Sequence, residues 1–236
     1  MADKRIEEIA KVLQVLFPKT HTFLEYTKDY ELLFAVILSA QATDISVNKA
    51  TSVLFQKFPN LDSYDETHKK DIFDIIKPLG LANSKSEYLI KTATALKTKY
   101  HGEIPRDRNE LMKLDGVGYK TSGVVLAELY DYPYFPVDTH VKRVSIRLGL
   151  VDENSSIQEI EEKLEKLFEG YHLIHLHRQF ILFGRNICFS RNPDCKVCPF
   201  SNFCAYFKNE SMERQRENIK QSRQSTARLK QVRWKE

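Results

Sequence analysis

The stretch LDGVGYKTSGVVLAELYDYPYFPVDTHVKRVSIRL, from Leu114 to Leu148, decides the fold of this chain. Gly116 and Gly118 flank Val117, and glycine permits a tight reversal that residues with a Cβ resist. The apolar residues that follow recur at helical spacing and predict a helix from about Val117 to Tyr130. The stretch therefore indicates a helix that begins directly after a glycine turn.

A shorter helix is expected before this turn. Asp107 and Glu110 are spaced as an acidic version of a capping box, which predicts a helix that starts near Arg108 and ends at Leu114 to Asp115. The two helices would form a hairpin. Backbone N–H groups at the turn favour an anion such as phosphate, although an ordinary hairpin that uses glycine for packing fits the same pattern.

Lys120 and Asp138 are the residues of this stretch that could carry chemistry. Lys120 falls in the first turn of the second helix, where a positive charge opposes the helix dipole. Asp138 is expected to be the N-cap of a helix that starts at Thr139. The helix rises about 15 Å from Lys120 to Tyr130, and the extended segment after it spans about 23 Å, enough to return. We expect an amine nucleophile beside an acid/base carboxylate; an exposed lysine and a plain capping aspartate are the alternatives.

The rest of the chain also predicts helices. Tyr30 to Ala40 is apolar nearly all round, which indicates a buried central helix. Ser84 and Glu87 predict a capping box for a helix that ends near Gly102. No apolar–polar alternation of useful length indicates a strand, so the expected fold class is all-α.

The four cysteines, Cys188, Cys195, Cys198 and Cys204, follow the pattern C-x6-C-x2-C-x5-C. No stretch reaches the ~18 apolar residues of a membrane span, and the N-terminal MADKRIEEIA has no apolar signal core. We therefore expect a cytoplasmic protein, in which clustered cysteines bind metal rather than form disulfides. Four thiolates suit either a tetrahedral zinc ion or a [4Fe–4S] cluster, and the two wider loops favour the cluster.

The net charge of +4 is concentrated at the C-terminal end. Lys208 to Glu236 holds nine basic and four acidic residues, a net charge of +5, which leaves −1 for the rest of the chain. Any nucleic-acid binding by the body of the protein must therefore use a local patch and oriented backbone dipoles. We expect this tail to add phosphate contacts that do not depend on sequence, with a solvated surface helix as the alternative.

These motifs together resemble one family. L-x-G-V-G-x-K-T followed by V-D-T-H-V-x-R-V is similar to the helix-hairpin-helix DNA glycosylases of the endonuclease III branch. FAVILSAQATDISVNKA (34–50) and LGLANSK (79–85) resemble two further blocks of that family. The similarity runs from about Ile6 to Phe207. It implies two helical domains, a six-helix domain with the hairpin at 22–132 and an iron–sulfur domain at 1–21 plus 133–207, followed by the basic tail at 208–236.

The resemblance implies a bifunctional DNA N-glycosylase and AP lyase of base excision repair. Such an enzyme removes oxidised or damaged pyrimidines from duplex DNA and cleaves the abasic site by β-elimination. Lys120 would be the nucleophile, Asp138 its carboxylate partner, and the four cysteines would hold a [4Fe–4S] cluster. Gln41 would fill the space left by the flipped nucleotide, and Leu81 would wedge into the base stack. Without the resemblance, a capping glutamine and a buried loop leucine are the ordinary alternatives.

The expected partner is double-stranded DNA that contains a damaged pyrimidine or an abasic site. We expect a monomer that is associated with the nucleoid in the cytoplasm and has no contact with a membrane. The residues expected to contact DNA are Gln41, Leu81, Gly116, Val117, Gly118, Thr121, His140, Arg143, Arg185, Arg191 and Lys196.

The hairpin departs from the family pattern at two positions. Asp115 stands where the family usually has proline, and Tyr119 stands where it usually has arginine, and both changes weaken the local positive field.

Three other interpretations of the chain exist. An adenine-type mismatch glycosylase shares the fold but lacks the lysine nucleophile, whereas a non-catalytic DNA-binding iron–sulfur protein or an electron-transfer protein needs no Lys120.

Overall fold

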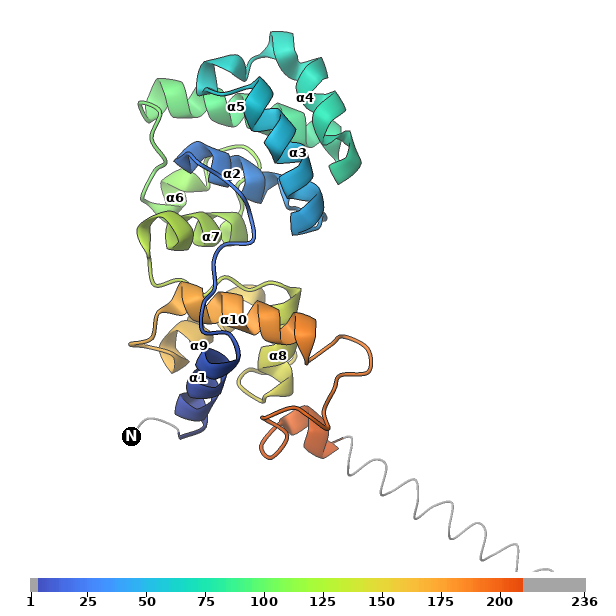
Figure 1. Ribbon diagram of the computed structural model, residues 1–236. Helices are drawn as coiled ribbons and strands as arrows, with labels where there is room; N and C mark the ends of the chain where they lie inside the picture. The colour runs from blue at the N-terminus through green and yellow to red at the C-terminus, as the bar shows by residue number, and fades with distance from the viewer. Residues whose placement is uncertain (1–3, 210–236) are drawn as a thin grey trace, which may run out of the picture. The chain divides into compact units, whose positions relative to one another are not determined.

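The structure of the protein, a computed structural model, describes residues 4–209, and the regular secondary structure in them is helical. No strand occurs among these residues, which confirms the predicted all-α class (Figure 1). None of the described helices combines the length and apolar character that a membrane crossing requires. Apart from Lys208 and Asn209, the predicted basic tail lies outside the described residues.

The chain divides into two compact units. The first, here called the hairpin unit, consists of Lys19–Pro136 and Glu165–Arg178. The second, here called the cysteine unit, consists of the described residues of Met1–Pro18, Val137–Leu164 and Gln179–Glu236. Helices α9 and α10 contribute residues to both units.

Most of the described helices belong to the hairpin unit. They are α2 (Asp29–Leu38), α3 (Asp44–Lys57), α4 (Lys69–Ile76), α5 (Ala82–Lys99), α6 (Arg108–Leu111) and α7 (Tyr119–Tyr130), with short 3₁₀ turns at Leu61–Ser63, Glu66–His68 and Lys77–Leu79. The cysteine unit contains α1 (Lys4–Leu16), α8 (Thr139–Arg147), and the larger parts of α9 (Ile157–Leu167) and α10 (Leu173–Asn186).

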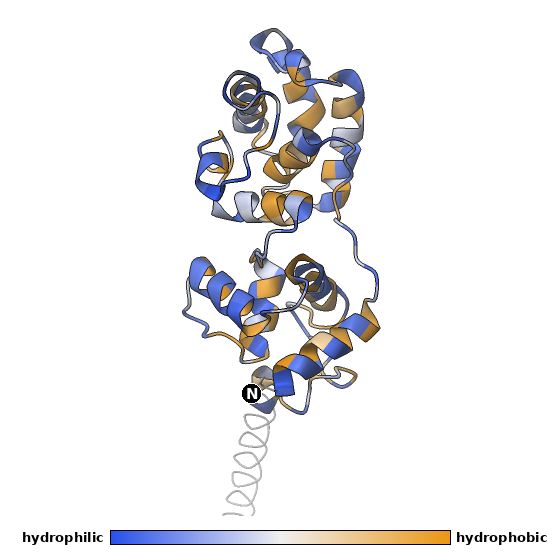
Figure 2. Ribbon diagram, turned by 90° about the vertical axis from the view of Figure 1, so that its left-hand side faces the viewer, coloured by the Kyte–Doolittle hydropathy of each residue, from blue (hydrophilic) through white to orange (hydrophobic). Residues whose placement is uncertain are grey.

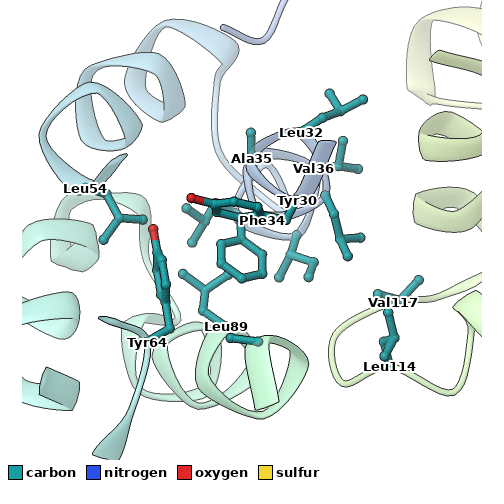
Figure 3. Packing of buried hydrophobic residues seen from close by; sticks show 14 of the residues in the cluster. Tyr30, Leu32, Phe34, Ala35, Val36, Leu54, Tyr64, Leu89, Leu114 and Val117 are labelled. Atoms are coloured by element: carbon teal, nitrogen blue, oxygen red, sulfur yellow. The ribbon is translucent and has the colours of Figure 1, made fainter. Parts of the chain in front are cut away.

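Helix α2 is the centre of the hairpin unit, as its sequence predicts. Every side chain from Tyr30 to Leu38 is buried. The one charged residue among them, Glu31, is satisfied locally, because its carboxylate accepts hydrogen bonds from the backbone N–H groups of Thr27 and Lys28 at 2.8 and 3.1 Å. Figure 3 shows apolar side chains from the surrounding elements gathered around this helix.

The cysteine unit has its own apolar core. Its helices each bury one stripe of apolar side chains, and Figure 2 shows the resulting mixture of hydrophobic and hydrophilic positions along the helices of both units. A buried amide also ties α10 to the end of α1, because Gln179 Nε2 donates to Phe17 O at 2.9 Å and to Gln14 Oε1 at 3.1 Å. The buried stripes include Ile6, Ile9, Leu13, Val141, Val144, Ile160, Leu164, Phe180 and Phe183.

The two helices of the hairpin are shorter than predicted. Helix α6 ends at Leu111 instead of Leu114 to Asp115, and α7 begins at Tyr119 instead of Val117. The chain needs these residues to reverse, and Val117 N–H donates to Leu114 O at 3.1 Å to close the turn. The capping interaction is half of a capping box, because Asp107 accepts the N–H of Glu110 at 2.9 Å while the Glu110 carboxylate bonds to Tyr100 and Lys113.

The predicted capping box at Ser84 and Glu87 is wrong. Helix α5 starts three residues earlier than that prediction required, with Leu81 as its N-cap residue, so Ser84 already lies inside its first turn. The Glu87 carboxylate instead forms an ion pair with Lys91 one turn further along, at 2.6 Å. An S-x-x-E pattern fits both a helix start and a helix interior, and here the left-handed Leu81 decides the start.

Tyr64 provides a test of the core of the hairpin unit. It is fully buried against Phe34, with ring centroids 4.9 Å apart, and its hydroxyl has no hydrogen-bond partner (Figure 3). Since an unsatisfied buried hydroxyl is unfavourable, we predict that Tyr64→Phe raises the free energy of unfolding by about 1 kcal/mol. Urea unfolding followed by circular dichroism measures this.

The matched control is Tyr30→Phe. The Tyr30 hydroxyl donates to Pro59 O at 2.9 Å. Removal of this hydroxyl breaks the hydrogen bond and should lower the free energy of unfolding by about 1 kcal/mol. A destabilised Tyr64→Phe variant would show that the Tyr64 hydroxyl has a favourable partner.

Candidate functional site

The glycine turn is fixed against helix α5. Gly116 has a φ of +77°, and a Cβ at this position would lie 2.8 Å from Cδ2 of Tyr88. Thr92, one turn further along α5, donates its hydroxyl to Asp115 O at 3.0 Å. Two side chains of α5 therefore hold the turn, and the backbone comes so close to one of them that only glycine fits.

The turn presents the start of helix α7. Gly118 is the N-cap residue in an extended conformation, and the first bond within the helix runs from Ser122 N–H to Gly118 O at 3.0 Å. The N–H groups of residues 119–121 precede that bond and have no acceptor within the helix. Lys120 lies in this first turn, as predicted, and its side chain is exposed, whereas Thr121 beside it is half-buried. This arrangement of N–H groups and a cation suits a phosphate group.

Arg108 places a second cation at the hairpin, and the sequence analysis missed it. Its Nη2 donates to Tyr119 O at 2.9 Å, and its Nε donates to Ser122 Oγ at 3.3 Å. The guanidinium carbon lies 3.6 Å from the centre of the Tyr119 ring and 4.4 Å from that of Tyr134. The tyrosine that replaces the family's usual arginine thus holds an arginine from the neighbouring helix, and the turn keeps a positive charge.

Asp138 is the N-cap of helix α8, as predicted. Its carboxylate accepts the backbone N–H of Val141 at 2.7 Å, which fixes the side chain at the helix start. Asp138 belongs to the cysteine unit and Lys120 to the hairpin unit. The predicted pairing of these two side chains stays a prediction.

Gln41 and Leu81 are both exposed and both have left-handed backbone conformations, with φ of 58° and 53°. Gln41 lies at the break between α2 and α3, as the sequence indicates, and Leu81 follows Gly80 at the start of α5. The Leu81 side chain is 56% exposed, which argues against the alternative of a buried loop leucine.

The predicted DNA contacts His140 and Arg143 have partners inside the cysteine unit. Arg143 donates to Cys188 O at 3.1 Å, to Gly184 O at 2.9 Å and to His140 Nδ1 at 3.1 Å. Burial, together with Arg143 and Arg185, lowers the pKa of His140, while Asp138 raises it. Arg143 therefore anchors the start of the cysteine loop.

The other predicted DNA contacts differ in exposure. Val117 is buried and its N–H closes the turn, so its side chain contributes to the core of the hairpin unit. Gly116 and Gly118 are exposed at the turn. In the cysteine unit, three basic residues are exposed on or beside the cysteine loop: Arg185, Arg191 and Lys196.

The cysteine loop, residues 188–204, carries four thiols and no disulfide. Burial raises the pKa of the Cys198 thiol to about 11, and the other three thiols also raise it, so the four sulfurs act on one another. Donors point at the sulfurs: Arg147 Nη1 lies 3.4 Å from Cys188 Sγ, and the N–H groups of Tyr206 and Phe207 lower the pKa of Cys204, which burial raises. Within residues 4–209, no group of three or more potential ligands is arranged to bind a single metal ion.

Arg147 is a second residue that the sequence analysis missed. Besides its contact with Cys188, it donates to Phe189 O and Ser190 O, at 2.6 and 3.0 Å, and stacks on the Tyr206 ring. It holds both ends of the cysteine loop. No local spacing identifies it, because its partners lie about forty or more residues away in the sequence.

The fold and this hairpin define a class of protein. Residues 34–170 match the family model of the HhH-GPD superfamily base excision DNA repair proteins. Since this match covers more than half of the chain, the protein belongs to that superfamily.

Individual relatives assign the protein to one family within this superfamily. Endonuclease III of Rickettsia felis is 41% identical over 202 residues, which cover 86% of this chain and 94% of that protein. Endonuclease III of Escherichia coli K12 is 39% identical over 203 residues, covering 86% and 95%. A non-covalent Endonuclease III–DNA complex matches with a TM-score of 0.84 at 38% identity, covering 89% of this chain and 98% of that one. A trapped Endonuclease III–DNA covalent intermediate matches with a TM-score of 0.83, also at 38% identity, covering 88% and 98%. Within the superfamily, the chain is a member of the endonuclease III family.

The close contact at Gly116 generates a stability prediction. Gly116→Ala would place a Cβ against Tyr88 and hold alanine in the left-handed region, so we expect the free energy of unfolding to fall by about 2–4 kcal/mol. Gly118→Ala is the matched control, because a Cβ there meets nothing within 4 Å; its cost should not exceed about 1 kcal/mol, that of a poor N-cap residue. Thermal unfolding of both variants compares them, and equal losses would contradict the packing argument.

Proposed function

We propose that this protein is a bifunctional DNA N-glycosylase and AP lyase that acts on damaged pyrimidines in duplex DNA. The observation that carries the proposal is the exposed Lys120 in the first turn of α7, directly after a turn whose N–H groups suit a phosphate. The relative that was trapped as a covalent intermediate with DNA supports it, since an amine nucleophile forms such an intermediate.

In the proposed first step, the neutral amine of Lys120 attacks C1′ of the damaged nucleotide. The bond from C1′ to the base breaks, and the base leaves with the electron pair and gains a proton. The nitrogen then loses one proton, and the bond from C1′ to the ring oxygen breaks as that oxygen gains a proton, which gives a protonated Schiff base between Nζ and C1′. Asp138 stabilises the positive charge that develops on the sugar and takes up the proton that the nitrogen loses.

The second proposed step cuts the strand. The Schiff base makes the protons on C2′ acidic, so that one of them is removed by a base. The electron pair forms a double bond from C2′ to C3′ and expels the 3′ phosphate, which is β-elimination. Water hydrolyses the Schiff base and releases Lys120.

DNA binding in this proposal depends mainly on phosphate contacts. The N–H groups at the turn bind one phosphate, and the Arg108 charge adds attraction there. Three exposed basic residues at the cysteine loop, Arg185, Arg191 and Lys196, would contact further phosphates. Gln41 and Leu81 would enter the duplex while the damaged nucleotide is flipped out, because such wedges offset part of the unstacking cost.

We also propose that the four cysteines hold one [4Fe–4S] cluster. The donor set fits, because four thiols lie on one short loop and N–H groups and Arg147 donate toward the sulfurs, as is usual around thiolate ligands. When bound, the cluster would fix the shape of the loop that carries Arg191 and Lys196. The domain boundaries follow the family resemblance: 22–132 for the six-helix domain and 1–21 plus 133–207 for the cluster domain.

We propose a monomer that acts on the nucleoid in the cytoplasm, with the basic tail from Lys208 to Glu236 adding phosphate contacts. An adenine-type mismatch glycosylase is disfavoured by Lys120 and by the endonuclease III identity of the relatives. A purely DNA-binding or electron-transfer role leaves the exposed Lys120 unused.

Lys120→Gln tests the nucleophile. Glutamine keeps the length and polarity of the side chain but cannot form a Schiff base, so the variant should still bind duplex DNA. It should lose both strand cleavage and the covalent complex that borohydride traps on a duplex with an abasic site. Lys99→Gln, at the exposed end of α5, is the control and should trap like the wild type. A Lys120→Gln variant that still traps would mean that another amine is the nucleophile.

The cluster proposal predicts a coloured protein. The purified chain should be brown, absorb broadly in the visible range and contain about four irons, because thiolate-ligated clusters have this signature. Cys198→Ala should lose the colour and most of the iron, whereas Ser201→Ala on the same loop should keep both. An active, colourless protein with one bound zinc ion would refute the assignment.

A further inference from the structure

Lys85 on helix α5 is a buried lysine with two backbone partners. Its exposure is 2%. Its Nζ donates to Ala40 O at 2.8 Å and to Leu79 O at 3.0 Å. Ala40 directly precedes Gln41, and Leu79 is two residues before Leu81. One ammonium group therefore contacts the two loops that carry Gln41 and Leu81, and all of these residues belong to the hairpin unit.

Both loops are conformationally strained next to these contacts. Gln41 and Leu81 have φ of 58° and 53°, which lie in the left-handed region that is unfavourable for residues other than glycine. Such conformations persist where the surrounding structure over-determines them, and they occur often at functional sites. Lys85 also holds Leu81 through its backbone, because its N–H donates to Leu81 O at 2.9 Å. The two exposed side chains are thus presented by backbones that Lys85 holds in place.

A buried ammonium is a poor choice if packing is the only requirement. Burial lowers the pKa of Lys85, because the charged form loses water, and the position in the first turn of α5 opposes the helix dipole. Methionine has a similar length and would fill the space without either cost. What the ammonium adds is a set of directed hydrogen bonds to two separate loops, which fixes their relative position.

We propose that Lys85 is a positioning residue that couples the two loops, so that Gln41 and Leu81 enter the duplex as one preassembled pair. This inference rests on the proposed function. Because the two loops are already ordered before DNA binds, the flipping step does not include the entropy cost of ordering them. It therefore speeds the extrusion of a stacked base and leaves the chemistry at Lys120 unchanged. Lys85 has no role as a nucleophile here, since its side chain is buried and its ammonium donates to two backbone carbonyls.

The test compares two substrates under single-turnover conditions at saturating enzyme. One duplex contains thymine glycol, a damaged base that must be unstacked, and the other has an abasic site, which has no base to unstack. Lys85→Met should slow cleavage of the thymine glycol duplex by about tenfold or more, the effect expected from losing hydrogen bonds of ordinary strength. Cleavage of the abasic duplex should change by less than about threefold. A merely structural role would reduce both rates by the same factor.

Lys97→Met is the matched control, since Lys97 is a half-buried lysine on the same helix that forms an ion pair with the exposed Asp62. It should leave both rates at the wild-type level. Gln41→Ala and Leu81→Ala should show the same substrate-dependent loss as Lys85→Met. In a Leu81→Ala background, Lys85→Met should add clearly less than its separate effect, because both changes act on one unit.

Lys85→Gln keeps an N–H donor and should show an intermediate loss, and it replaces Lys85→Met if circular dichroism shows that the latter does not fold. Equal losses on both substrates, full additivity with Leu81→Ala, or a wild-type rate on thymine glycol would each overturn the inference. A wild-type protein that cleaves neither duplex would instead overturn the proposed function itself.

Discussion

The close packing of the glycine turn on helix α5 is the interaction on which the hairpin unit depends. A Cβ at Gly116 would meet the Tyr88 ring at 2.8 Å, so the turn can approach the helix only because the side chain is absent. This approach brings Asp115 O within reach of Thr92 and fixes where α7 begins. The position of Lys120 therefore depends on the left-handed backbone of Gly116 and on the contacts of the turn with Tyr88 and Thr92.

Helix α5 also fixes the two loops that carry Gln41 and Leu81. Its first turn holds the backbones beside Gln41 and Leu81 through Lys85, and its second and third turns hold the hairpin through Tyr88 and Thr92. The hairpin that carries the proposed nucleophile and the loops proposed for base extrusion therefore share one support, helix α5, within the hairpin unit. A rigid support is useful because a side chain must be correctly placed before binding if its contacts are to favour the reaction.

Local patterns in the sequence were enough for much of this structure. The apolar run of α2, the glycine turn and the capping role of Asp138 depend on neighbouring residues, and all three are present as predicted. The start of α5 was mispredicted because Ser84 and Glu87 fit a helix interior as well as a cap. Arg108 and Lys85 were missed for a different reason. Their roles come from contacts with residues distant in the sequence, such as Ala40, 45 positions from Lys85, and no spacing rule reports those. A lysine on the buried stripe of α5 was the one available signal.

The three side chains of α5 that hold the loops and the glycine turn also constrain the number of residues between them. Lys85, Tyr88 and Thr92 are three and four residues apart, so they lie on one face of the helix. A single residue inserted between Lys85 and Thr92 would turn everything after it by about 100°, since an α-helix has about 3.6 residues per turn. Thr92 would then point away from the glycine turn while Lys85 still held its loops. The number of residues between Lys85 and Thr92 is therefore fixed, although exposed positions in this segment of α5 can accept substitutions.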